Sequence, residues 1–119
     1  MLAAAAALFL TCTVVDGDTI RCDGERVRLS GIDAPETSAC RKGRKCVRGD
    51  GQAATRALAS IIAGKRVTVI RLGRDRYGRT IAAVYVDKRN VACELLARGH
   101  AVYRADWDNR RKVARDCRI

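Results

Sequence analysis

The chain has 119 residues, enough for one domain with a modest hydrophobic core, and its 48% hydrophobic content excludes an intrinsically disordered protein. Its net charge of +11, from 24 basic and 13 acidic residues, favours a polyanionic partner, with nucleic acid ahead of acidic membrane surfaces or glycans. Only five of the basic residues are lysine, and the planar fork of arginine suits phosphate. A basic surface that reflects only genome composition and solubility remains the alternative.

The N-terminus, MLAAAAALFL, is apolar and rich in small residues. It resembles the end of a signal peptide, with an A-x-A cleavage site around Ala5 to Ala7. An alanine-rich extension of the first strand is the alternative, and the segment is far too short to span a membrane. We therefore expect a leader remnant over residues 1–7 and one domain over residues 8–119.

Three strands are predicted in the first third of the domain. Residues 8–15 (LFLTCTVV) are β-branched and apolar, and Asp16-Gly17 is a hairpin-turn signal. A second strand over residues 19–22 leads through Asp23-Gly24 into a third over residues 25–32, whose alternation places Val27 and Leu29 on the inner face. The three strands form a meander.

A polar loop and then a helix are predicted after the third strand. Residues 37–50 are polar, basic and too irregular for a regular element. Asp50 is a predicted N-cap for a helix over residues 52–63 (QAATRALASIIA), which has Leu58, Ile61 and Ile62 on one stripe, and Gly64 follows as its stop signal.

The last part of the chain returns to strands before it ends in helices. Strands are predicted over residues 66–72 and 80–86, a second helix from its cap Asn90 through Arg98, and a frayed third helix over residues 106–117. The fold class is therefore α+β and mainly β, a five-stranded OB-fold-like barrel with two or three packed helices. The face of such a barrel commonly binds oligonucleotides.

Six cysteines in a short chain indicate an oxidising compartment. The absence of a CxxC pair and the single histidine, His100, argue against a zinc site or a thioredoxin-type motif. Fifteen pairings exist in principle, and a free, buried thiol is the alternative. The spacing favours two short closures and, by elimination, a third: Cys12–Cys22 across the first hairpin, Cys40–Cys46 in the polar loop, and Cys93–Cys117.

Unusual polar residues lie beside the apolar strands. Asp18 lies at a turn and Asp33 at a strand end, and Pro35 stiffens the chain so that Glu36 stays near them. Three converging carboxylates repel one another, so a metal or arginines must compensate. Carboxylate and carbonyl oxygens without histidine or cysteine suit calcium or magnesium.

This residue set matches the needs of phosphodiester hydrolysis. A cation on Asp18 and Asp33 would polarise the phosphate, Arg28 and Arg79 could donate paired hydrogen bonds to it, and Glu36 could accept a proton from water. Each motif alone also fits an ordinary turn or a solvated strand residue.

Strand parity adds one structural expectation. Arg28 and Asp33 would face opposite sides of a regular strand, so we expect a bulge at Gly31 to re-aim one of them.

The segments VVDGDT, RVRLSGIDAPE and DRYGR occur here in the order and with gaps similar to those of the staphylococcal nuclease (thermonuclease) family, which the chain resembles from about Thr13 to about Gly99. The resemblance implies an OB-like barrel and a calcium-dependent, sugar-nonspecific endonuclease that leaves 3′-phosphate ends. The cysteines resemble those of exported bacterial relatives.

The resemblance also implies roles for individual residues. Ala34 stands where threonine is often found, and only its carbonyl is expected at the metal. The tyrosines that stack the base in the family do not align cleanly, so Tyr103 and Trp107 are the nearest candidates. The implied site comprises calcium ligands Asp18, Asp33 and the Ala34 carbonyl, the general base Glu36, the phosphate arginines Arg28 and Arg79, and the substrate contacts Tyr77, Arg76 and Tyr103.

We therefore expect a secreted or periplasmic monomer that takes DNA, RNA or both as substrate, with Ca²⁺ as cofactor. Two other functions compete with this hypothesis. A catalytically silent nucleic-acid-binding module on the same barrel would bind without cleaving, and a disulfide-rich cationic peptide would act on membranes without a metal.

Overall fold

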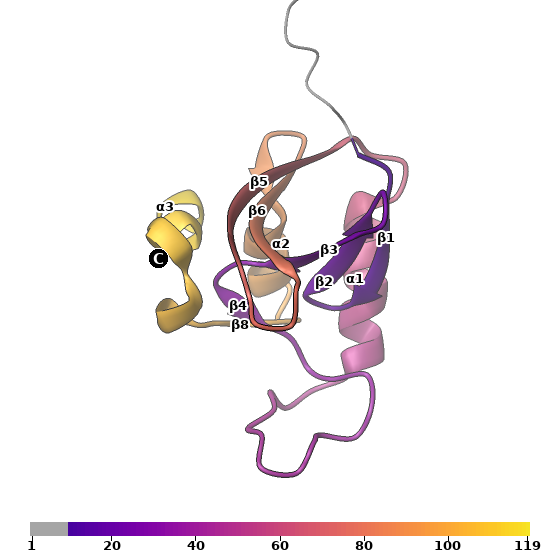
Figure 1. Cartoon of the computed structure of the whole chain (residues 1–119), viewed down its shortest axis with the longest axis vertical. Helices are drawn as coiled ribbons and strands as arrows, with labels where there is room; N and C mark the ends of the chain where they lie inside the picture. Colours follow the sequence, from indigo (N-terminus) through magenta and orange to yellow (C-terminus); the bar gives the residue numbers. More distant parts are fainter. Residues whose placement is uncertain (1–9) are drawn as a thin grey trace, which may run out of the picture.

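The computed structural model describes residues 10–119 and contains two β-sheets with helices packed around them (Figure 1). The strands of the main sheet are β1 (Cys12–Asp16), β2 (Thr19–Cys22), β3 (Glu25–Leu29), β5 (Val67–Arg74), β6 (Thr80–Val86) and β7 (Arg89–Asn90). The small second sheet pairs β4 (Ile32–Asp33) with β8 (Val102–Tyr103). The helices are α1 (Gly51–Ile62), α2 (Val91–Ala97) and α3 (Lys112–Cys117), with 3-10 turns at Ala105–Trp107 and Asn109–Arg111.

The main sheet has the strand order β1-β2-β3-β6-β5, with β7 paired to β6. All its pairs are antiparallel except β3 with β6, which are parallel. A single antiparallel bridge between Leu10, just before β1, and Val67, at the start of β5, joins the two edges of the sheet. The sheet therefore curls back on itself. The predicted mainly β, OB-like fold is confirmed, and β4, β7 and β8 are short strands beyond the five expected.

The first hairpin follows the predicted pattern. Cys12 lies opposite Cys22 in the register of β1 and β2, and both Val27 and Leu29 are buried. The predicted strand over residues 8–15 begins later, since β1 starts at Cys12. Residues 8 and 9, like the predicted leader over residues 1–7, lie outside the described residues.

The predicted continuous strand over residues 25–32 is wrong, because the chain turns at Ser30 and Gly31. Gly31 has a φ of 81°, and a Cβ added there would lie 2.8 Å from Cγ2 of Val113. Glycine, which has no Cβ, accommodates both the positive φ and the close approach of Val113. The turn lets the next two residues form β4 and pair with β8 near the end of the chain, which redirects Asp33 as the strand parity required.

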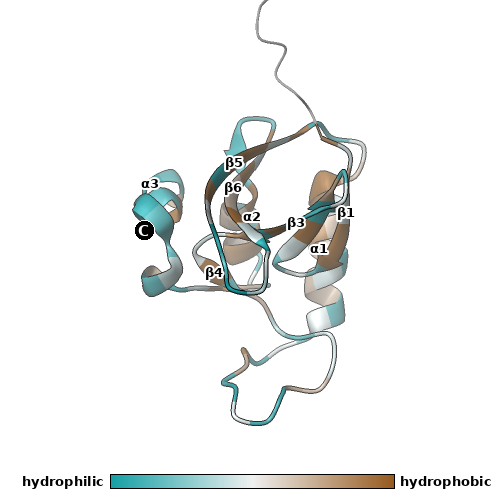
Figure 2. Ribbon diagram, in the orientation of Figure 1, coloured by the Kyte–Doolittle hydropathy of each residue, from teal (hydrophilic) through white to brown (hydrophobic). Residues whose placement is uncertain are grey.

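The helices begin where their caps predict. Asp50 accepts a 3.0 Å hydrogen bond from the backbone N–H of Ala53, and Asn90 accepts one of the same length from Ala92. α1 buries Leu58 and Ile62, and its brown, apolar turns lie beside β1 in Figure 2. No helix among residues 10–119 combines the length and apolarity that a membrane crossing requires.

The third helix is shorter than the predicted span of residues 106–117, because α3 begins only at Lys112. Arg110 and Arg111 have φ values of 57° and 53°, which interrupt any continuous helix before it. Asp108 stands just before this interruption and accepts hydrogen bonds of 2.9 Å from the backbone N–H groups of Val113 and Ala114.

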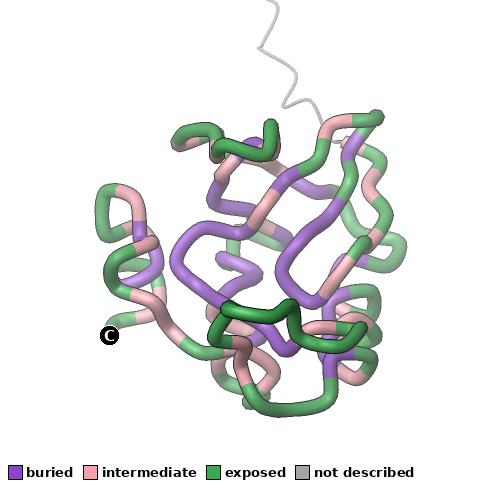
Figure 3. Tube along the Cα trace, turned by 60° about the horizontal axis from the view of Figure 1, so that its bottom comes forward, coloured by how far each residue is buried: buried purple, intermediate pink, exposed green. Residues whose placement is uncertain are grey.

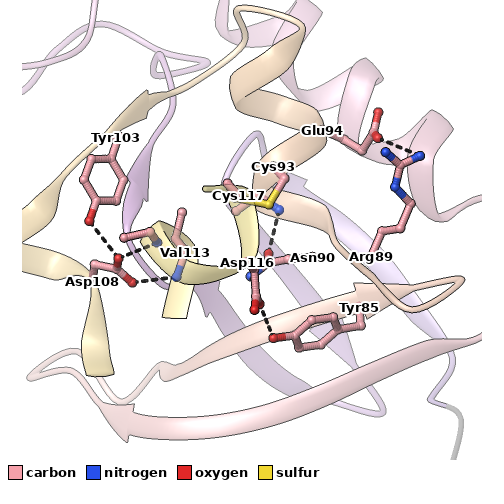
Figure 4. The surroundings of a disulfide bond; sticks show 12 residues. Tyr85, Arg89, Asn90, Cys93, Glu94, Tyr103, Asp108, Val113, Asp116 and Cys117 are labelled. Carbon is pink, nitrogen blue, oxygen red and sulfur yellow. Dashed lines mark hydrogen bonds and ion pairs between the residues drawn. A yellow bond between two sulfur atoms is a disulfide. The ribbon is translucent and has the colours of Figure 1, made fainter. Parts of the chain in front are cut away.

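All three predicted disulfides are confirmed: Cys12–Cys22, Cys40–Cys46 and Cys93–Cys117. The last joins α2 to α3, and a polar cluster reinforces it (Figure 4). Asp116 accepts hydrogen bonds from the Tyr85 hydroxyl and from Nδ2 of Asn90. Sequence reasoning anticipated the covalent link but not the carboxylate that connects α3 to the sheet.

Candidate functional site

Two acidic side chains and one arginine converge where β3 and β4 meet. Asp18 precedes β2 and Asp33 ends β4, and both are buried. Nη2 of Arg28 lies 3.6 Å from Oδ2 of Asp18 and 3.7 Å from Oδ1 of Asp33. The turn at Gly31 therefore brings together three residues that the sequence separates by up to fifteen positions.

Backbone groups fix this arginine and the first aspartate. Nη1 of Arg28 donates 2.9 Å hydrogen bonds to the carbonyls of Leu29 and Ile32. Oδ2 of Asp18 accepts a 2.9 Å hydrogen bond from the backbone N–H of Ala34. The side chains are thus held before any ligand arrives, which lowers the cost of binding one.

Asp33 lies in an environment that disfavours its negative charge. Burial and the nearby charge of Asp18 raise the pKa of Asp33 above its ordinary value, although Arg28, Arg44 and Arg104 oppose that shift. Nη2 of Arg44 lies 3.9 Å from Oδ1 of Asp33, and Nη1 of Arg104 lies 3.7 Å from its Oδ2. Burial is the larger cause, so the site disfavours the charged form of Asp33 even with three arginines nearby, and a cation bound here would favour it.

The donors at this point fit a hard metal ion. Asp18 and Asp33 bring carboxylate oxygens to this point, the ligand type that calcium prefers, and Ala34 lies beside them with its N–H hydrogen-bonded to Asp18. Within residues 10–119 no group of three or more histidine, cysteine, aspartate or glutamate side chains is arranged to hold a metal. A calcium ion here would therefore need carbonyl, water or phosphate oxygens to complete its coordination.

Glu36 lies at the edge of this centre and pairs with Arg44, a residue that sequence reasoning did not select. Nη1 of Arg44 lies 3.1 Å from Oε1 of Glu36. The backbone of Glu36 is held by the start of α1, because a Cβ on Gly51 would lie only 2.0 Å from the Glu36 carbonyl oxygen. Glycine at position 51 is therefore required for this close approach.

A second arginine approaches from the turn between β5 and β6. Oδ1 of Asp75 accepts 2.9 Å hydrogen bonds from the backbone N–H groups of Tyr77 and Arg79, and its Oδ2 accepts one of 2.7 Å from Nε of Arg79. Burial acts to raise the pKa of Asp75, but the hydrogen bonds and charge of Arg79 and the Tyr77 N–H lower it below its ordinary value. Asp75 thus stays ionised and orients Arg79.

The two arginines meet in a pocket of about 410 Å³. The predicted residues Arg28, Arg76, Tyr77 and Arg79 all line it. Nη2 of Arg76 donates a 3.1 Å hydrogen bond to the Tyr77 hydroxyl, and the Tyr77 side chain is 58% exposed at the rim. The complete lining is Arg28, Leu29, Ser30, Gly31, Arg44, Asp75, Arg76, Tyr77, Arg79, Ile81 and Trp107.

The two predicted stacking residues have different positions. Trp107 lines the pocket, and its ring centroid lies 5.0 Å from the Cζ of Arg28 and 4.2 Å from that of Arg104. Tyr103 does not line the pocket; its hydroxyl donates a 2.8 Å hydrogen bond to Oδ2 of Asp108, and this bond raises the pKa of the phenol. The structure therefore brings Trp107, rather than Tyr103, to the arginines.

Sequence reasoning gave no role to three residues at the site: Arg44, Asp75 and Arg104. Asp75 stands four residues before Arg79 in a motif already singled out, so its spacing was a usable signal. Arg44 and Arg104 approach Asp33 from a loop without regular structure and from the end of a two-residue strand. No local pattern in the sequence indicates either approach.

Comparison with known proteins gives a consistent result. The profile of the family described as "Staphylococcal nuclease homologue" matches residues 26–117. An uncharacterized endonuclease of Haemophilus influenzae is 38% identical over 99 residues, covering 76% of this chain and 51% of the relative. A thermonuclease of Staphylococcus intermedius is 36% identical over 99 residues, covering 78% of this chain and 57% of the relative. The chain thus spans little more than half the length of these relatives.

Proposed function

Because the chain belongs to the staphylococcal nuclease homologue family, we propose that it is a calcium-dependent endonuclease that hydrolyses phosphodiester bonds of DNA, RNA or both. We propose further that it is indifferent to the sugar and leaves 3′-phosphate ends. The single observation that carries the proposal is the convergence of Arg28 with Asp18 and Asp33 beside a pocket that Arg79 also lines.

The metal ligands in this proposal are the carboxylates of Asp18 and Asp33 and the carbonyl of Ala34. Bound calcium would polarise the phosphate and orient the attacking water. The burial of Asp33 and its position beside Asp18 support this assignment, since a cation there would compensate two neighbouring carboxylates.

The protein's own side chains bind and orient the phosphate. Arg28, on β3, and Arg79, just before β6, both line the pocket, and each could donate hydrogen bonds to phosphate oxygens. Both are preorganised, Arg28 by two carbonyls and Arg79 by Asp75. Charge that develops on the phosphate during hydrolysis would therefore meet donors already in place.

Glu36 is the proposed general base, accepting a proton from the attacking water. Its carboxylate is partly exposed and held by Arg44, so that it lies at the edge of the acidic centre without being buried. Tyr77 and Arg76 are the proposed substrate contacts in the pocket, and the position of Trp107 supports this residue as a further surface for a base. Tyr103 is proposed as a contact only for a substrate that extends beyond the pocket, because its hydroxyl is bonded to Asp108.

We also propose that the protein acts outside the cytoplasm, secreted or in the periplasm, as a monomer. Three disulfides among residues 12–117 support an oxidising environment. On protein from an exported expression system, size-exclusion chromatography with light scattering tests the oligomeric state, and intact mass spectrometry tests the oxidised form.

One assay separates the proposed nuclease from a silent binding module. Purified protein is incubated with plasmid DNA, single-stranded DNA and RNA, with calcium or with a chelator. Degradation that requires calcium is expected, and the balance among the three substrates gives the preference. Retarded migration of intact nucleic acid in both conditions, with no cleavage, would instead identify a binding module.

A further inference from the structure

A groove of about 840 Å³ continues from the pocket along the loop 37–50. Pocket and groove share the side chains of Arg44, Arg76, Tyr77, Arg79 and Trp107. A polymer with one phosphate in the pocket would therefore extend directly into the groove.

The groove is strongly basic. Eight of its sixteen lining residues carry positive charge and two carry negative charge. Both acids are already engaged, since Asp16 accepts a 3.0 Å hydrogen bond from Thr37 and Glu36 pairs with Arg44. The basic residues are Arg26, Arg41, Lys42, Arg44, Lys45, Arg76, Arg79 and Arg104.

Half of these cations lie within one small covalent ring. The disulfide between Cys40 and Cys46 encloses the five residues Arg-Lys-Gly-Arg-Lys, four of which are basic. Arg44 is tied to Glu36, but within the described part of the chain no carboxylate lies at ion-pair distance from Arg41, Lys42 or Lys45. All three are exposed, so their charge is available to a ligand.

The disulfide is the main constraint on this part of the loop. Residues 34–50 contain no helix or strand, and residues 37–45 form an exposed stretch at the front of Figure 3. The base of the loop is fixed by packing, since a Cβ on Gly49 would lie 2.9 Å from Cγ of Pro35. Between Cys40 and Cys46 the only backbone hydrogen bond described runs from the N–H of Arg44 to the carbonyl of Arg41, at 3.1 Å.

We propose that the ring closed by Cys40 and Cys46 is one wall of the polynucleotide-binding groove, in which Arg41, Lys42 and Lys45 hold backbone phosphates next to the one being cleaved. The disulfide keeps these cations facing the groove. The proposal rests on the proposed function for the position of the cleaved phosphate, but it concerns binding and is testable without cleavage.

The test uses fluorescence anisotropy, in buffer that contains a chelator, to measure binding of fluorescein-labelled single-stranded DNA of two lengths. One strand is a dinucleotide and the other a dodecanucleotide. The groove variant is Arg41→Gln/Lys42→Gln/Lys45→Gln. Its charge-matched control is Arg21→Gln/Arg48→Gln/Arg56→Gln, which removes three exposed cations outside the groove. The unmodified protein should bind the dodecanucleotide more tightly than the dinucleotide. The groove variant should bind the dodecanucleotide about tenfold more weakly than the unmodified protein does, with little change in its affinity for the dinucleotide.

Salt dependence gives a second readout of the same contacts. The slope of log affinity against log salt for the dodecanucleotide should become less negative by about 2 in the groove variant, because three phosphate contacts are lost. Equal losses for both lengths, or equal losses in the control variant, would overturn the groove assignment.

The disulfide is tested with Cys40→Ser/Cys46→Ser, after circular dichroism confirms that the fold is retained. Affinity for the dodecanucleotide should fall toward that of the groove variant, while dinucleotide binding stays unchanged. Undiminished affinity for the long strand would contradict a role for the disulfide. A protein that binds both strands as expected but never cleaves would leave the groove intact and refute the nuclease proposal.

Discussion

Arg79 donates a 2.7 Å hydrogen bond from Nε to Oδ2 of Asp75, four residues earlier in the turn between β5 and β6. The other oxygen of Asp75 accepts the backbone N–H groups of Tyr77 and Arg79. One carboxylate therefore shapes the turn and aims the guanidinium that the turn carries.

We predict that Asp75→Asn lowers kcat about tenfold with a smaller change in KM, because Arg79 loses its charged partner but keeps its own charge. The free energy of unfolding should fall by about 1–2 kcal/mol. Steady-state kinetics and urea denaturation measure the two effects. Asp87→Asn is a suitable control, since that carboxylate is 69% exposed and pairs only with Lys65 among the ion pairs of the described chain. Unchanged kcat in Asp75→Asn would remove Asp75 from the site.

Glu36→Gln should reduce the rate of hydrolysis by about two orders of magnitude or more, because glutamine cannot accept a proton from water. Affinity for nucleic acid should persist, since Glu36 carries no attractive charge for phosphate. Single-turnover cleavage and anisotropy separate the two quantities. Glu94→Gln, on α2 and paired with Arg89 and Arg98, provides the matched control. Near-normal turnover in Glu36→Gln would show that another group acts as the general base.

Asp33→Asn should abolish cleavage yet, in a chelator, raise the melting temperature at neutral pH by a few degrees. Because burial and Asp18 raise the pKa of Asp33 in the folded state, the folded protein holds a proton more tightly than the unfolded chain. Stability therefore falls as the pH rises from the ordinary value of 3.8 through the raised pKa, and the neutral amide escapes that loss. A melting temperature below that of the unmodified protein would contradict the prediction.

Calcium should stabilise the unmodified protein, because a ligand that binds only the folded state raises the melting temperature. At a concentration one hundred times its Kd the gain is about 2.7 kcal/mol. Asp33→Asn should respond much less, whereas Asp87→Asn should respond fully. Scanning calorimetry with calcium and with a chelator makes the comparison, and equal responses in all three proteins would place the metal elsewhere.

Glu25 should show the opposite dependence on pH. Hydrogen bonds from Arg71 and Thr80 lower its pKa from 4.5 to about 2, so its contribution to stability is complete above pH 4.5 and disappears as the pH falls toward 2. Solvent screening limits that contribution to about 1 kcal/mol. Glu25→Gln should flatten the stability profile over this interval, as measured by urea denaturation at several pH values. An unchanged profile would show that the pair is neutral for stability.

Local signals in the sequence predicted most of the fold. Hairpin turns at Asp16-Gly17 and Asp23-Gly24, together with the caps Asp50 and Asn90, mark their elements through contacts only a few residues apart. The pairing of β4 with β8 could not be predicted in this way. Each strand has two residues, and neither is long enough to show a hydrophobic period.

The residues of the candidate site likewise fall into those that the sequence motifs predicted and those that they did not. The motifs indicated Asp18, Arg28 and Asp33, and the structure brings them together. The approach of Arg44 and Arg104 depends on the loop 37–50 and on the segment after β8, whose positions are set by a disulfide and by long-range packing. These contacts depend on the assembled tertiary structure, which the sequence pattern does not specify.

The pairing of β4 with β8 also bears on when the proposed site can form during synthesis of the chain. Asp33 lies on a strand whose partner is made some seventy residues later, and the turn at Gly31 is held by the carbonyl of Trp107. A nascent chain still emerging from the ribosome therefore cannot hold Asp33 in place beside Asp18. The Cys93–Cys117 bond secures the segment that follows β8 only under oxidising conditions, so the proposed activity would be withheld until β8 has been made and the bond has formed.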